Sequence, residues 1–425
     1  MLGWEFPPYI SGGLGTACYG LTKAMDKLGI KVTFVLPRGA GNPAASVKNI
    51  GANDIQAATQ FEQFANIKFR VISSNLKPYA MVGSRAYVKL KKHDSGKTLL
   101  EIVDADLNLS PDNYTGDILA AVGQYADRAV RIAETEKFDV IHAHDWMTYP
   151  AGGAVSWQSH KPLVVHVHST EFDRSGEHVN QAVYDIERMG MHSAARVIAV
   201  SNLTKETIVK HYGVSPAKVE VVYNAVEHNG NGVCHIPPEK KGKIVLFLGR
   251  ITMQKGPEYF LAAAKKVIDT IDNVKFIMAG SGDMMHRIIE MAAQMGIGNK
   301  VLFTGFLNGK DVDRAYKMAD LYVMPSVSEP FGIASLEAMN RNVPVLVSKQ
   351  SGVAEVVTHA LKVDFWDINE MANKMIAVLN RPPLQKTLRT NGFHESHKFS
   401  WEDSAKKVAK IYDEVIVQAQ NKKEG

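Results

Sequence analysis

Short apolar runs alternate with longer amphipathic stretches along the first half of the chain. The runs are rich in β-branched residues and apolar on both faces, which is typical of strands buried in a parallel sheet. The stretches between them, such as 116–135 and 202–211, indicate helices. This alternation predicts a doubly wound α/β domain, with a very short first strand at Leu2-Gly3 and further strands at 31–36, 138–142, 162–168, 196–200 and 218–222.

A segment from Glu227 to Lys243 interrupts this alternation. It crowds Gly, Asn, Pro and Lys together, as exposed interdomain linkers do. The alternation then restarts, so we predict a second doubly wound domain, with domain limits of 1–235 and 236–398. Its expected elements are strands at 244–248, 274–279, 301–304, 321–324 and 343–347 and a helix at 258–271.

The tail from Trp401 to Gln418 is amphipathic and predicts a C-terminal helix, which we treat as a separate unit at 399–425. Its apolar positions share one face, and they are Val408, Ile411, Tyr412 and Val415.

The composition is that of a globular protein and excludes several other classes. Hydrophobic residues make up 45% of the 425 residues and charged residues 22%, which excludes a disordered chain, a collagen-like fibre and a disulfide-stapled miniprotein. The net charge of +5 is compatible with an anionic ligand but too weak to indicate nucleic acid. The length favours two or three domains.

The cysteines and the N-terminus bear on location. Cys18 and Cys234 lie far apart without a CxxC pair, which fits a reducing compartment. The first residues have no basic region followed by an apolar one, so we expect no signal peptide. No apolar run approaches the roughly 18 residues that a membrane span needs. We therefore expect a cytoplasmic protein.

Ligands of open α/β sheets bind beyond the carboxyl ends of the strands, so candidate chemistry is sought there. Gly12 and Gly13 follow the first strand and precede a helix that extends through Lys27. Glycines let a backbone approach a ligand, and a helix N-terminus offers free N–H groups to an anion. A tight strand-to-helix turn explains the same glycines equally well.

Histidines and an acid follow two neighbouring strands of the first domain. We expect Asp145 and His168, at the strand ends, to hydrogen-bond sugar hydroxyls, and His142 and His166, one step back, to be structural. A purely structural histidine network is the alternative. No metal site is predicted, because no carboxylate or cysteine stands at ligand spacing from these histidines.

Arg250 and Lys255 flank a turn at the end of the second domain's first strand. Two fixed cations beside a glycine can hold a diphosphate and stabilise it as a leaving group, although such cations are often merely solvated. A further glycine turn includes Ser281, which we expect to contact the donor. The segment 304–307, ending at Leu307, is expected to offer backbone N–H and C=O groups to a flat ring of the donor.

The segment 325–339 carries the strongest signal. Glu329 lies in a turn shaped by Pro330 and Gly332, a helix is expected to begin near Gly332, and Glu337 lies about one turn further on. The first amides of that helix, on Gly332, Ile333 and Ala334, would face a phosphate. Each acid also has a simpler explanation, as a helix cap or as an acid favoured by the helix dipole.

Glu-Pro-Phe-Gly followed by a second Glu eight positions after the first resembles the E-x7-E motif of retaining glycosyltransferases. The chain resembles glycosyltransferase family 4, with features of the glycogen and starch synthases of family 5. Supporting segments occur in the family's order over nearly the whole chain: Gly12-Gly13-Leu14-Gly15, His144-Asp145-Trp146, Val167-His168, Gly249-Arg250, Lys255-Gly256 and Ser351-Gly352-Val353-Ala354-Glu355.

The resemblance implies the GT-B fold: two Rossmann-like domains facing a central cleft, with a C-terminal helix that crosses back to the first domain. It implies that Arg250 and Lys255 bind the donor diphosphate, Glu329 the donor sugar and Glu337 the ribose. His168 and Asp145 would lie against the sugar from the first domain.

Two departures mix the family patterns. Ile10-Ser11 stand where family 5 starch synthases carry Lys-Thr, which removes a lysine contact to the diphosphate, and Glu337 is kept although family 5 usually lacks it. The expected function is retaining transfer of a hexose, glucose foremost, from ADP- or UDP-glucose to an α-glucan or related saccharide, without cofactor or metal.

Other functions stay open. A family 4 transferase could make a small saccharide or sugar phosphate, of the sucrose phosphate or maltose phosphate type. A nucleotide-sugar epimerase would need bases to remove a proton from the sugar, and it would leave Glu337, Arg250 and Lys255 unexplained. A non-catalytic sugar-nucleotide-binding protein would normally have lost the cations or the acids.

Overall fold

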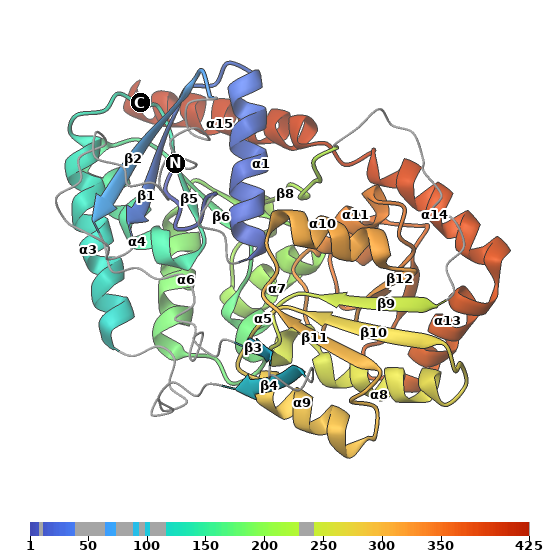
Figure 1. Ribbon diagram of the computed structural model, residues 1–425. Helices are drawn as coiled ribbons and strands as arrows, with labels where there is room; N and C mark the ends of the chain where they lie inside the picture. Colours follow the sequence, from blue (N-terminus) through green and yellow to red (C-terminus); the bar gives the residue numbers. More distant parts are fainter. Residues whose placement is uncertain are drawn as a thin grey trace.

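The computed structural model describes residues 1–7, 12–38, 64–73, 88–92, 98–102, 116–228 and 242–424. These residues form two α/β domains, each built on a parallel sheet, and a long C-terminal helix that lies on the first domain (Figure 1). The predicted fold class is confirmed.

The first sheet is parallel and is centred on the very short first strand. Leu2 forms parallel bridges to Val35 on one side and to Ala143 on the other, so it joins two groups of strands into one sheet. The strands are β1 (Val32–Arg38) with β2 (Ile67–Ser73) on one side and β5 (Ile141–His144), β6 (Leu163–Val167), β7 (Arg196–Ala199) and β8 (Val219–Val221) on the other.

Helices cover this sheet, and most of its buried strand positions are apolar, as expected for a doubly wound domain. They are α1 (Gly13–Lys27), α3 (Gly116–Ala133), α4 (Tyr149–Ser159), α5 (Glu171–Ser175), α6 (Gln181–Ser193) and α7 (Asn202–Tyr212). An antiparallel hairpin of β3 (Val88–Lys92) and β4 (Thr98–Ile102), which the sequence pattern did not predict, is inserted before α3.

The second sheet has the order β11-β10-β9-β12-β13-β14, and every described pairing in it is parallel. The strand order reverses between β9 and β12, and ligands of such sheets bind at that switch point. The strands are β9 (Lys243–Leu248), β10 (Val274–Ala279), β11 (Val301–Gly305), β12 (Leu321–Met324), β13 (Val345–Ser348) and β14 (Leu361–Val363).

The helices of the second domain shield both faces of its sheet (Figure 1). They are α8 (Pro257–Ile268), α9 (Met285–Gln294), α10 (Gly309–Met318), α11 (Ile333–Asn340), α12 (Val353–Val356), α13 (Ile368–Asn380) and α14 (Pro382–Ser396). None of the helices in the described part of the chain combines the length and apolar character needed to cross a membrane.

The C-terminal helix α15 (Trp401–Glu424) returns to the first domain and packs on α1 (Figure 1). The indole of Trp401 lies against Gly20, where a Cβ would come within 2.2 Å of the ring. The Tyr412 hydroxyl is hydrogen-bonded to Nδ1 of His142 at 2.5 Å. The predicted apolar face is buried, and the expected crossing back is confirmed.

The two connections between the domains run next to each other. Val226 N–H points to the carbonyl of Phe399 at 3.5 Å, and His228 Nε2 lies 3.3 Å from the same carbonyl. The predicted boundary at residue 235 lies outside the described residues, so the limits of 1–235, 236–398 and 399–425 stay predictions.

Candidate active site

The turn after β12 presents an open helix N-terminus. Gly332 precedes α11 with φ of 107°, a conformation that favours glycine, and a Cβ there would come within 2.9 Å of the Met324 methyl group. Within the described residues no side chain caps α11. The first amides of a helix have no intrahelical acceptor, so those of Ile333 and Ala334 can receive an anion.

A predicted cation and a predicted acid form an ion pair beside this helix start. Nζ of Lys255 lies 2.5 Å from Oε2 of Glu329, and the Ser326 hydroxyl donates to the same oxygen at 3.3 Å. Both charged side chains are largely buried, with 18% and 11% exposure. The backbone of Glu329 is fixed by its N–H, which donates to the Gln350 carbonyl at 3.0 Å. The carboxylate therefore has a defined position.

Gln254 holds the cation-bearing turn against the acid-bearing turn. Its side-chain oxygen accepts a hydrogen bond from Nη2 of Arg250 at 3.0 Å, and its backbone carbonyl accepts from Val327 N–H at 2.9 Å. Gln254 is buried. The sequence analysis missed this residue, and its position between the two predicted cations was the signal available.

Glu337 projects from the second turn of α11. The Tyr316 hydroxyl donates to its Oε2 at 3.1 Å, and the Arg341 guanidinium lies over the Tyr316 ring, 5.2 Å from its centre. Burial raises the pKa of Glu337, and the charge of Arg341 and the tyrosine hydrogen bond oppose that rise. Tyr316 therefore orients the carboxylate, and sequence reasoning did not find it.

The glycine turn after β10 packs against the turn that carries Arg250. A Cβ on Gly280 would stand 1.8 Å from the carbonyl oxygen of Gly249, and one on Gly282 would stand 2.2 Å from that of Ile251. The Ser281 carbonyl accepts from Ile251 N–H at 2.9 Å. Close backbone packing thus accounts for these glycines, and donor contact by Ser281 stays a prediction.

The segment expected to face a flat ring is partly engaged within the protein. The Gly305 carbonyl accepts from Gly280 N–H at 2.8 Å, and the half-buried Leu307 packs against the hydrophobic core. Phe306 between them is 58% exposed. Ring contact by Leu307 remains a prediction.

The glycine loop of the first domain lies beside a buried acid that the sequence analysis missed. Gly12 is the N-cap of α1, and Gly13 begins the helix. Oε2 of the buried Glu5 accepts a hydrogen bond from Gly15 N–H at 3.0 Å. This helix start therefore already faces a carboxylate, which disfavours a phosphate at the same amide.

Asp145 anchors the neighbouring strand end. Its Oδ1 accepts hydrogen bonds from the backbone N–H of His168 at 2.7 Å and of Ser169 at 3.4 Å. Its backbone has φ of 60° and ψ of 169°, a conformation that costs a non-glycine residue about 1–3 kcal/mol. Burial raises the pKa of Asp145 to about 7. Through these hydrogen bonds the Asp145 carboxylate positions the backbone of His168.

His168 follows β6 and is half-buried. Its Nε2 lies 3.0 Å from Nδ1 of His144, and its Nδ1 is buried without a partner among the described residues. Burial lowers the pKa of His168 to about 3, so the imidazole is neutral at pH 7. A neutral ring with an unused nitrogen can exchange a hydrogen bond with a ligand hydroxyl.

Contacts across the junction bring the two groups of candidate residues close. The Ser328 hydroxyl donates to Oδ1 of Asp173 at 2.6 Å, and the Ser201 hydroxyl donates to the Pro330 carbonyl at 2.6 Å. Ser328 precedes Glu329 directly, and Asp173 lies five residues after His168. The structure thus places the turn of Glu329 against the segment that follows His168.

Two parallel-sheet domains, a helix crossing back to the first, and a cation–acid pair at an open helix N-terminus define a glycosyltransferase of the GT-B fold. Residues 111–229 match Glycosyltransferase Family 4, and residues 235–395 match Glycosyl transferases group 1. The chain belongs to these glycosyltransferases, and the predicted resemblance is confirmed.

Similar proteins cover nearly the whole chain. A glycosyltransferase of Methanocaldococcus jannaschii is 29% identical over 97% of both chains. A glycogen synthase of Mycobacterium tuberculosis is 24% identical over 97% of this chain and 93% of its own. HepE of Anabaena, solved in complex with UDP and glucose, superposes with a TM-score of 0.70 at 19% identity, covering 97% of this chain and 98% of HepE.

Proposed function

We propose that this glycosyltransferase is a retaining enzyme that moves a hexose, glucose foremost, from ADP- or UDP-glucose to a glucan or related saccharide. The observation that carries the proposal is the Lys255–Glu329 ion pair beside the open N-terminus of α11. The pair sets a cation where a diphosphate would lie and a carboxylate where the attached sugar would lie.

Different groups of the protein suit the diphosphate and the ribose of the donor. Arg250, Lys255 and the amides at the start of α11 suit the diphosphate, because fixed cations and free N–H groups stabilise its negative charge. Glu337, oriented by Tyr316, suits the ribose, since a carboxylate can accept from two neighbouring hydroxyls.

Transfer then proceeds by attack on the face from which the leaving group departs. The acceptor hydroxyl oxygen bonds to the anomeric carbon as the bond from that carbon to the diphosphate oxygen breaks. The departing phosphate oxygen takes the hydroxyl proton, which yields a glycoside with retained configuration and a nucleoside diphosphate. Arg250, Lys255 and the helix amides stabilise the charge that develops on the leaving group.

The first domain completes the sugar site through His168. We assign its half-buried neutral ring to contact with the sugar, and Asp145 acts as a positioning residue through the backbone of His168. Gly12 and Gly13 leave open space at the start of α1, since no described atom lies within 4 Å of their Cβ positions. We assign these glycines to close approach of the protein backbone to the donor.

The names of two relatives suggest two candidate acceptors. One is the glycogen synthase, and another is a D-inositol 3-phosphate glycosyltransferase of a Mycobacterium species, 27% identical over 64% of this chain and 66% of its own. Coverage favours the glucan, because the glycogen synthase matches along almost the entire chain. A small phosphorylated acceptor is the second candidate. HepE, solved also with UDP-glucose, makes this donor the first to try.

A donor screen tests the proposal. The full chain is incubated with ADP-, UDP- and GDP-sugars, each with maltooligosaccharides or with sugar phosphates, and the released nucleotide is measured. We expect release from a glucose donor that depends on the acceptor, and an α-linked product by NMR. A β-linked product would contradict retention. Isomerised nucleotide sugar without nucleotide release would indicate the epimerase, and binding without any turnover would indicate a non-catalytic protein.

A further inference from the structure

A group of four histidine side chains lines one face of the first sheet. His142 and His144 alternate along β5. His166 lies in β6 and His168 directly follows that strand with the same alternation, so all four rings share one face of the sheet. Their rings stack, with centres 4.2 Å apart for His142–His144 and 4.2 Å apart for His166–His168. This stack extends from the candidate active site into the core.

The hydrogen bonding of the stack is far from complete. Five of its ring nitrogens are buried without a partner among the described residues: Nε2 of His142, Nε2 of His144, both nitrogens of His166 and Nδ1 of His168. Buried polar atoms nearly always have a partner, and each exception calls for an explanation such as a water or an ion. Protein contacts therefore leave these five nitrogens unpartnered among the described residues, and the partner of Nδ1 of His144 and of Nε2 of His168 is the other ring of that pair.

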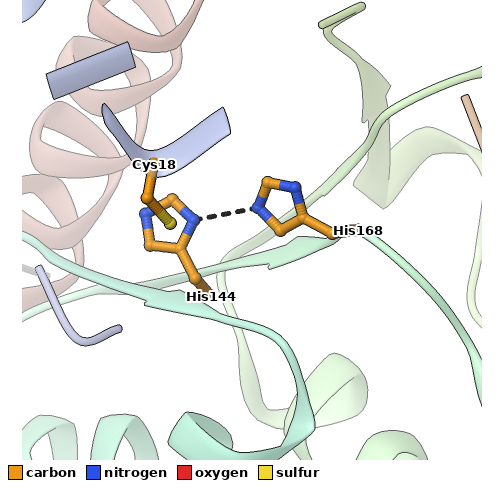
Figure 2. A group of neighbouring side chains, drawn as sticks. All are labelled: Cys18, His144 and His168. Atoms are coloured by element: carbon orange, nitrogen blue, oxygen red, sulfur yellow. Dashed lines mark hydrogen bonds between the residues drawn. The ribbon is translucent and has the colours of Figure 1, made fainter. Parts of the chain in front are cut away.

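A cysteine from α1 reaches the same place. Cys18 is fully buried and forms no disulfide within the described part of the chain. Its sulfur and ring nitrogens of His144 and His168 all lie within 4.8 Å of one another. Figure 2 shows the sulfur beside the His144 ring and the His168 ring pointing at His144. Nδ1 of His144 and Nε2 of His168 lie 3.0 Å apart.

We propose that Cys18, His144 and His168 form a binding site for a zinc-type divalent metal ion. Two imidazoles and one thiolate are ligands that Zn²⁺ prefers, at about 2.0–2.1 Å for nitrogen and about 2.3 Å for sulfur. Two nitrogens in a tetrahedral zinc site stand about 3.3 Å apart by that geometry. The 3.0 Å between the facing nitrogens needs only a small separation of the rings to admit the ion.

A second set of histidines competes with this assignment. His142, His144 and His166 also lie within 4.8 Å of one another. That set has no thiolate, one nitrogen of His142 is already hydrogen-bonded to Tyr412, and all three side chains are buried. His168 by contrast is half-buried, which gives an ion a route to the site. The observations favour the set with Cys18.

The metal would restrain the proposed transfer reaction. An ion bound to Nε2 of His168 fixes the ring that we assign to a sugar hydroxyl, so transfer should slow when the ion is bound. This consequence rests on the proposed function, whereas metal binding itself does not. Diphosphate stabilisation needs no metal in that function, and the ion acts as an inhibitor.

Metal binding is measured on the full chain after removal of metal by a chelator. Zn²⁺ is titrated in competition with a chromophoric chelator, and Co²⁺ serves as a spectroscopic probe of thiolate ligation. The variants are Cys18→Ser and, as the matched control, Cys234→Ser, with melting curves to verify folding. Cys18→Ala replaces the serine variant if the latter does not fold.

We expect one Zn²⁺ per chain in the wild type and in Cys234→Ser, and affinity at least about tenfold weaker in Cys18→Ser. A near-ultraviolet thiolate-to-cobalt band should appear in the first two proteins and be absent from the third. Failure of the wild type to bind Zn²⁺ would overturn the proposal. Equal affinity in Cys18→Ser would also overturn it and would assign the ion to the histidine-only set.

A separate measurement tests whether the bound ion slows transfer. Transfer rates are measured with and without Zn²⁺, and each is expressed relative to the metal-free rate of the same variant. We expect slowing in the wild type, reversal by chelator and weaker slowing in Cys18→Ser. Zinc binding without slowing would overturn the assignment of His168 to the sugar and leave the metal site supported. An enzyme without any transfer activity would refute the proposed function, while the binding data would still decide the metal site.

Discussion

The hydroxyl of Ser328 donates a hydrogen bond to Oδ1 of Asp173 at 2.6 Å and links the two domains next to the candidate active site. Oδ2 of the same carboxylate accepts from Thr170 N–H at 2.7 Å, so Asp173 caps α5 with one oxygen and contacts the second domain with the other. The segment after His168 and the turn of Glu329 are thus held in one arrangement.

We predict that the two domains close on the donor, because its proposed contacts come from both domains. Removing the link between Ser328 and Asp173 should make this closure less favourable. Ser328→Ala loses one hydrogen bond to a charged group, worth about 1.5–3 kcal/mol, and we expect donor KM to rise about tenfold or more with a smaller change in kcat. Ser193→Ala, whose hydroxyl donates to the local Gly190 carbonyl, is the control. Small-angle scattering should show compaction with saturating donor in the wild type and less in Ser328→Ala. Equal KM values would show that the contact does not contribute to closure.

Lys255→Ala should abolish most turnover. It removes a cation from the leaving group and leaves Glu329 without its ion-pair partner. Loss of such a contact typically raises the barrier by about 2.7–4 kcal/mol, a factor of 10²–10³ in rate. Arg250→Ala should have a similar effect. The control is Lys265→Ala, an exposed cation on α8 paired with Asp269. Normal kcat/KM with unchanged melting in both site variants would refute the diphosphate assignment.

The two acids should have separable effects. Glu337→Gln should raise donor KM and the Kd of the free nucleoside diphosphate together, because hydrogen bonds to a charged group contribute about 1.5–3 kcal/mol. Glu329→Gln should mainly lower kcat, because its contact is to the sugar that develops charge in the transition state. Donor kinetics and nucleoside-diphosphate titration on both variants distinguish these effects. Weaker nucleotide binding in Glu329→Gln alone would assign the nucleoside to Glu329 and the sugar to Glu337.

Transfer should need no added metal. The proposed diphosphate site consists of cations and helix amides, so we expect EDTA to leave the rate undiminished and Mg²⁺ or Mn²⁺ to have no stimulating effect. The measurement is nucleotide release before and after chelation. Activity that is lost in EDTA and restored by Mg²⁺ would contradict the expectation.

The stability of the fold should depend on the contact between α1 and α15. Gly20→Ala places a methyl group where the Trp401 ring stands, and such overpacking typically costs about 1–3 kcal/mol. Gly123→Ala in α3 is the control, since no described atom lies within 4 Å of its Cβ position. That substitution should be neutral or stabilise by up to about 1 kcal/mol. Chemical unfolding of both variants measures the difference in stability. Equal unfolding midpoints would show that α15 can shift to admit the methyl group at no cost in stability.

The sequence by itself determined the fold and the local part of the candidate site. Buried strands and covering helices impose their periodicity on neighbouring residues, so most strands and the terminal helix were predictable from pattern. Glu329, Gly332 and Glu337 lie within nine residues, where the turn and the helix fix their relation. The hairpin of β3 and β4 escaped prediction, because short strands of mixed polarity have no clear period.

The tertiary structure decided which distant residues meet. Lys255 and Glu329 are 74 residues apart and form an ion pair because two strand-end turns adjoin at the switch point of the second sheet. Cys18 is separated from His144 and His168 by more than a hundred residues, and it reaches them because α1 packs on the sheet face from which they project. Such contacts depend on how whole elements pack, which local periodicity does not encode. For that reason sequence spacing gave no sign that Cys18 lies beside His144 and His168.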